Sequence, residues 1–108
     1  MSYWISLQNE KNEIAQVESF IAGGTYVLGG SCEADLNITY NYSKLFNFRS
    51  LHEQKARGTI KILKETIKEY GIKKDSDYWK CTKGNVGYCL SILLNWALQY
   101  PEYKWNVN

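Results

Sequence analysis

Residues 34–42 read ADLNITYNY, with an apolar or aromatic residue at every second position. Because successive side chains of a strand point to opposite faces, this alternation predicts a half-buried β-strand. It is the clearest strand pattern in the chain. Its expected buried face consists of Ala34, Leu36, Ile38, Tyr40 and Tyr42.

Weaker strand patterns precede this segment. Residues 3–7 alternate in the same way, and a polar, turn-like stretch follows at residues 8–12. Residues 13–20 fit either a strand or a weak helix, and we favour a strand because a short turn after a strand favours a hairpin. Residues 25–28 lie between two glycine pairs and form at most a short strand.

The second half of the chain carries two helical patterns. Apolar residues recur at spacings of four and three through residues 55–70, and Gly71 follows as a C-terminal stop. These apolar residues are Ala56, Ile60, Leu63, Ile67 and Tyr70. For the second helix, Thr82 or Asn85 is the expected N-cap, and Pro101 lies just past the end. Its main apolar stripe comprises Val86, Leu90, Leu93, Leu94 and Ala97.

Together these patterns predict a single α+β domain over residues 1–108. A small antiparallel sheet of three to four strands from the N-terminal half is packed by two helices from the C-terminal half. The alternating tail at residues 103–107 can add an edge strand. A chain of 108 residues is long enough for one hydrophobic core.

The composition excludes several classes of protein. Hydrophobic residues make up 44% and charged residues 22%, which excludes disordered and fibrous chains. The net charge of +2 requires neither a nucleic-acid nor a membrane partner. We expect no signal peptide, because the N-terminus lacks a basic region followed by a long apolar run. Three cysteines, an odd number, argue against a disulfide scaffold, so we expect a soluble protein of the cytoplasm.

No catalytic template is visible in the sequence. It contains no nucleophile elbow, zinc-protease motif, phosphate-binding loop or dinucleotide fingerprint. His52 is the only histidine, and nothing in the sequence ties it to Cys32, Cys81 or Cys89. The cysteine spacing gives no zinc template either. We therefore predict that the protein is not an enzyme and uses no cofactor or metal.

A basic stripe follows one flank of the first predicted helix. It consists of Arg57, Lys61, Lys64 and Lys68, at spacings of four, three and four. Such a stripe can contact phosphates or an acidic protein surface. The alternative is a solvated face, in which Glu65 and Glu69 pair with lysines one turn away.

The second predicted helix carries apolar residues on a second side, in addition to its main stripe. Opposite its main stripe lie Tyr88, Ile92 and Trp96, at spacings of four. One explanation is burial on both sides, between the sheet and the first helix. The other is an exposed aromatic patch that binds a partner protein or a second copy of the chain.

Thr39, Tyr40 and Asn41 form a third candidate site. Side chains of these types make hydrogen-bonding walls for a small ligand, here a nucleotide-like one. The same residues also make an ordinary solvated sheet face, and the sequence leaves both interpretations open.

Three parts of the chain together carry a resemblance to a known family. They are GGTYVLGG at residues 23–30, EADLNITYNYS at residues 33–43, and a third part with Tyr78-Trp79-Lys80, Thr82, Gly84-Asn85 and Leu93-Leu94-Asn95-Trp96-Ala97. The chain resembles, over nearly its whole length, a family of small, mostly uncharacterised proteins encoded by bacteriophages, prophages and their bacterial hosts. These motifs carry no established catalytic residue.

The resemblance implies a noncatalytic accessory protein that binds and blocks a host protein in the host cytoplasm. Anti-CRISPR proteins, which inhibit defence nucleases of the host, are the prominent class of this kind. The alternatives are sequestration of a nucleotide-like ligand and nonspecific nucleic-acid binding through the basic flank of the first helix.

Overall fold

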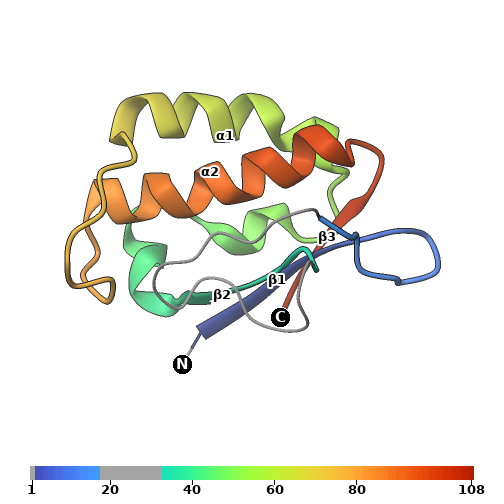
Figure 1. Ribbon diagram of the computed structural model, residues 1–108, viewed down its shortest axis with the longest axis horizontal. Coiled ribbons are helices and arrows are strands. Elements are labelled where there is room, and N and C mark those ends of the chain that lie inside the picture. Colours follow the sequence, from blue (N-terminus) through green and yellow to red (C-terminus); the bar gives the residue numbers. More distant parts are fainter. Residues whose placement is uncertain (1, 18–32) are drawn as a thin grey trace.

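The computed structural model describes residues 2–17 and 33–108. The expected strand at residues 25–28, residues 18–20 of the expected second strand, and Cys32 lie outside the described residues. Figure 1 shows the elements. In chain order they are β1 (Ser2–Gln8), β2 (Asp35–Thr39), the 3₁₀-helices η1 (Tyr40–Lys44) and η2 (Phe48–Leu51), α1 (Ala56–Tyr70), α2 (Lys83–Gln99) and β3 (Lys104–Val107).

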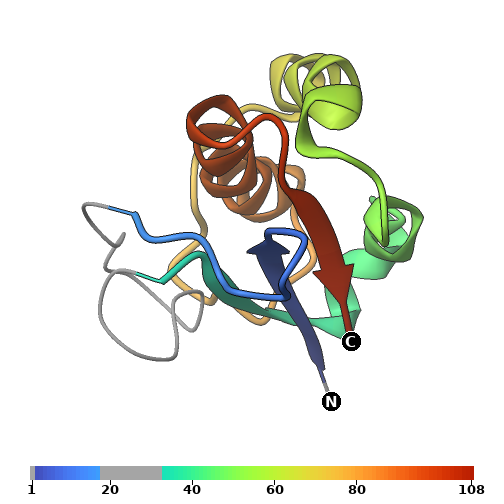
Figure 2. The ribbon, with the colours of Figure 1, turned by 90° about the vertical axis from the view of Figure 1, so that its right-hand side faces the viewer.

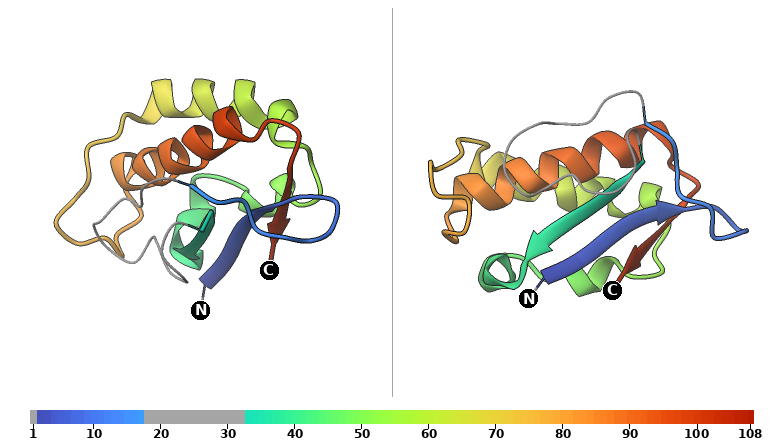
Figure 3. Two further views of the ribbon diagram at one scale, coloured as in Figure 1. Left: turned by 45° about the vertical axis from the view of Figure 1, so that its right-hand side comes forward. Right: turned by 60° about the horizontal axis from the view of Figure 1, so that its bottom comes forward.

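The three strands form an antiparallel sheet in the order β2-β1-β3. Ile5 of the central strand lies opposite Leu36 on one side and Val107 on the other. Both α-helices lie on one face of this sheet, with α2 nearer to the strands than α1 (Figures 1 and 2). Among the described elements, no helix covers the other face (Figure 3). The predicted α+β fold and the C-terminal edge strand are therefore confirmed.

The strand predicted over residues 34–42 is shorter than expected. Ala34, Leu36 and Ile38 are buried, as the alternation requires, but the strand ends at Thr39. The Thr39 hydroxyl accepts a hydrogen bond from the Asn41 backbone N–H at 3.3 Å and caps the 3₁₀-helix η1. A threonine that bonds its own backbone in this way competes with the strand ladder, and the sequence pattern does not show this.

The strand predicted over residues 13–20 is wrong for its described part. Residues 13–17 make only isolated bridges, Gln8 with Ile14 and Gln16 with Glu33. The preceding turn is closed by Asn9, whose Oδ1 accepts hydrogen bonds from the backbone N–H groups of Lys11 and Glu13 at 2.9 and 3.0 Å. The chain thus turns back beside β1 without a regular ladder.

The first helix matches its predicted bounds to within one residue, and the second begins after Thr82, one of its two expected N-caps. Gly71 ends α1 with a φ of 73°, which favours glycine. Thr82 caps α2, and its hydroxyl accepts a hydrogen bond from the Asn85 N–H at 3.0 Å. The apolar stripes of both helices are buried or partly buried in one core.

Gly84 and Gly87 allow α2 to pack directly against the backbone that follows α1. A Cβ atom at position 87 would lie 1.7 Å from the Gly71 carbonyl oxygen, and one at position 84 would lie 1.9 Å from the Lys73 carbonyl oxygen. Only glycine permits this approach. The two helices are therefore fixed relative to each other at this end.

The outer edge of β3 is covered by residues 52–54. The Glu53 N–H donates to the Trp105 carbonyl at 2.8 Å, and the Trp105 N–H donates to the Gln54 carbonyl at 3.0 Å. One step further along the strand, His52 Nδ1 accepts from the Val107 N–H at 2.9 Å. This edge therefore has few unpaired backbone groups.

None of the described helices is both long and apolar enough to cross a bilayer.

Candidate functional site

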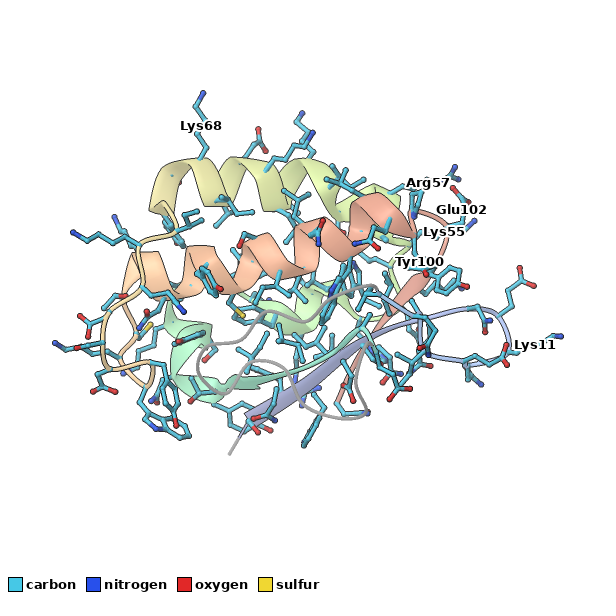
Figure 4. The ribbon with its side chains drawn as sticks, in the orientation of Figure 1. Lys11, Lys55, Arg57, Lys68, Tyr100 and Glu102 are labelled. Carbon is cyan, nitrogen blue, oxygen red and sulfur yellow. The ribbon has the colours of Figure 1, made fainter. Side chains whose placement is uncertain are left out.

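The basic face of α1, defined as Arg57, Lys61, Lys64 and Lys68, is the first candidate surface. All four side chains are exposed. The first and last residues are eleven positions apart, so the row is about 16 Å long at 1.5 Å per residue. Figure 4 shows Lys68 directed away from the body of the molecule at one end of α1, with Arg57 at the other end.

Packing on the opposite side of α1 fixes the direction of this face. Ala56, Thr59 and Leu63 are buried. The Thr59 hydroxyl donates to the Ala56 carbonyl at 2.7 Å and accepts from the Trp105 indole Nε1 at 2.9 Å. Since α1 is held against both α2 and β3, it cannot rotate its basic face inward.

The four cations of the basic face differ in their ion pairing. Arg57 Nη1 lies 3.2 Å from Glu102 Oε2, and both side chains are largely exposed. Lys61, Lys64 and Lys68 have no carboxylate within 4.0 Å in the part of the chain that the structure describes. The expected alternative, in which Glu65 and Glu69 pair with these lysines, is not seen. The three lysines are therefore available to a partner.

The second candidate surface is not accessible. Ile92 and Trp96 are only 1% and 2% exposed, and Tyr88 is partly buried. The structure agrees with the first of the two explanations, in which α2 is buried on both sides. The expectation of an exposed partner-binding patch is wrong for Ile92 and Trp96, because the sheet and α1 flank α2 on different sides (Figure 2).

The third candidate site is taken up by internal contacts. Thr39 is buried and caps η1. The Tyr40 ring packs edge-on against Tyr3, with 4.5 Å between ring centroids. Asn41 donates through Nδ2 to the Trp79 carbonyl at 3.1 Å. The three residues are adjacent, and each of these contacts is made within the chain.

Asn85 has a role that the sequence did not reveal. Its side chain is fully buried and organises the loop between α1 and α2. Oδ1 accepts from the Asp75 N–H at 2.8 Å, and Nδ2 donates to the carbonyls of Asp77 and Lys80 at 3.2 and 2.8 Å. The two carbonyls belong to residues on either side of Trp79, which is 50% exposed. The sequence pattern predicted Asn85 only as a possible cap.

The two described cysteines, Cys81 and Cys89, are not activated as nucleophiles. Burial raises the pKa of the Cys89 thiol, which is fully enclosed in the core. Desolvation also raises the pKa of Cys81, against the smaller opposing effect of the Lys44 charge. A reactive cysteine needs the opposite shift, toward the thiolate. Within residues 2–17 and 33–108, no group of three or more His, Cys, Asp or Glu side chains is arranged to hold a metal ion.

No family model matches this chain, and no significant match was found among curated proteins or among solved structures. The resemblance to small phage proteins therefore stays a prediction.

Proposed function

We propose that this protein acts by binding another protein, without catalysis, and that the basic face of α1 is its recognition surface. The observation that carries the proposal is the row formed by Lys61, Lys64 and Lys68. These side chains are exposed on a fixed helix, and no described carboxylate lies within 4.0 Å of them. Unpaired charges attract a partner of opposite charge. Because they lie on a rigid helix, little conformational entropy of the backbone is lost on binding.

An acidic protein surface fits this face better than a nucleic acid does. Glu65 and Glu69 are exposed beside the lysine row. They repel a phosphate backbone that runs along the helix. A folded partner, in contrast, can place its own cations opposite these two carboxylates, and such complementarity gives specificity.

The resemblance to phage proteins supports an inhibitor of a host defence nuclease that acts in the host cytoplasm. Nucleases and related effectors hold nucleic acid in positively charged channels. A basic helix face is repelled by such a channel. We therefore expect the inhibitor to dock on an acidic surface elsewhere on the nuclease, without competing for the nucleic-acid groove.

Comparative capture from a lysate of the native host tests the proposal. The triple variant Lys61→Glu, Lys64→Glu, Lys68→Glu reverses the charge of the row. We expect this variant to lose the captured partner, because attraction to an acidic surface becomes repulsion. Circular dichroism should show an unchanged fold, since the three side chains are exposed.

A matched control carries the same change of charge on another surface. Lys44, Lys73 and Lys80 are exposed and lie outside α1. Their triple replacement by Glu should retain the partner. Equal capture by both variants would contradict the proposal. Loss of capture after nuclease treatment of the lysate would instead favour the nucleic-acid alternative.

A further inference from the structure

A cavity of about 590 Å³ lies where three segments that are distant in sequence meet. The turn after β1, the residues just before α1 and the beginning of β3 all contribute to its lining. Figure 4 shows Lys55 and Glu102 at this end of the molecule, beside the turn that carries Lys11. The volume is within the range of small-molecule sites, roughly 300–1,000 Å³.

Two lysines face each other at this cavity. Lys55 and Lys104 form an antiparallel bridge, which places their side chains directly opposite each other. Like charges in this arrangement destabilise a sheet. Glu102 offsets Lys55, with its Oε1 at 3.4 Å from Nζ, but Lys104 has no carboxylate within 4.0 Å among the described residues. An anionic group between the two amines would relieve the repulsion.

The backbone around the cavity is also unusual. Asn12 and Glu53 are the only non-glycine residues with a positive φ in the described chain, at 62° and 66°, and both line this cavity. Asparagine adopts this conformation readily, whereas glutamate does so rarely. Residues held in such regions concentrate at binding sites, where the surrounding structure fixes them. Here the Glu53 N–H is held by the Trp105 carbonyl at 2.8 Å.

From this arrangement we infer that the cavity binds a small zwitterion, a free amino acid or a short peptide. The ligand carboxylate lies between Lys55 and Lys104. Its ammonium group meets Glu10 and Glu53, which line the same cavity with the opposite charge. The Asn106 amide in the lining can hydrogen-bond the polar remainder of the ligand. A ligand with charge of one sign only would leave either the two lysines or the two glutamates without a partner of opposite charge.

The test is a titration followed by two-dimensional amide NMR of the whole protein. The probes are the twenty free amino acids and the dipeptide Ala-Ala, each at millimolar concentration. We expect at least one probe to shift the amide signals of Glu53, Lys104 and Asn106. Blocking that probe at its amine or its carboxylate should weaken binding about tenfold or more for each lost charge. No shift with any probe, or equal binding of the blocked forms, would overturn the inference.

Two variants locate the site and separate binding from folding. Lys104→Met should weaken binding about tenfold. It should not lower the melting temperature, because it removes the repulsion with Lys55. The control Lys80→Met, in the loop before α2 and outside both proposed sites, should bind like the unmodified protein. If Lys104→Met binds the probe as tightly as the control does, the ligand carboxylate does not bind at Lys104.

Discussion

The two α-helices of this protein are similar in length and opposite in character. Three of the 15 residues of α1 are buried, against nine of the 17 residues of α2. α1 rests on its neighbours along one stripe, and most of its exposed side chains are charged. α2 is enclosed between α1 and the sheet. We therefore expect changes on α1 to alter binding, and changes on α2 to alter stability.

The largest expected effect compares two glycines, one on each helix. Gly87→Ala on α2 should lower the free energy of unfolding by about 4 kcal/mol or more, because the new Cβ meets the Gly71 carbonyl. A Cβ added at Gly58 on α1 meets nothing within 4 Å. Gly58→Ala should therefore raise the free energy of unfolding by about 0.5–1 kcal/mol, because alanine favours the helix. Urea denaturation measures both free energies of unfolding. Effects of the same sign would contradict the expected difference between the two helices.

The next effect compares two large apolar side chains. Trp96→Ala on α2 should cost about 3–5 kcal/mol of unfolding free energy, since the indole is almost completely buried. Ile62→Ala on α1 should change it by less than about 0.5 kcal/mol, because that side chain is 47% exposed. A near-neutral Trp96→Ala variant that also loses its partner would restore the exposed-patch interpretation.

The smallest effect concerns a partly buried carboxyl group on β2 and its dependence on pH. Desolvation, with a smaller contribution from Glu33, raises the pKa of Asp35 above its ordinary value of 3.8. The folded state therefore holds this proton more tightly than the unfolded state does, so Asp35 lowers stability as pH rises through the raised pKa. Asp35→Asn should be more stable than the unmodified protein at neutral pH, and the difference should vanish below pH 3.8.

Denaturation at the two pH values measures this difference. Glu69→Gln on the exposed side of α1 removes the same charge and is the matched control. A difference for Asp35→Asn that stays constant with pH would show that the carboxyl is not desolvated.

Local patterns predicted the helices well. The four-and-three spacing, Gly71 and Thr82, one of the two expected N-caps, located both helices, because amphipathic periodicity and caps are local signals. The continuation of β2 to residue 42 failed, because the Thr39 hydroxyl turns the chain into η1. Periodicity does not report such side-chain competition.

The candidate sites depended on nonlocal structure, which the sequence shows poorly. The basic stripe is local to one helix and was found where predicted. The direction of Trp96 depended on which elements cover α2, and the spacing alone left it open. The zwitterion cavity brings together residues near 10, 54 and 104, so no motif connects them. The pairing of β3 with β1 and the bridge between Lys55 and Lys104 bring these segments together.

The pairing of β1 with β3 also affects synthesis of the chain. Ile5 and Val107 are partners in the sheet but leave the ribosome about 100 residues apart. At about 5–20 residues per second, the nascent β1 waits roughly 5–20 s for its second neighbour. During that interval one side of the central strand lacks its native partner and can pair with other chains. High-level expression should therefore favour inclusion bodies, and slower translation should favour recovery of the native protein.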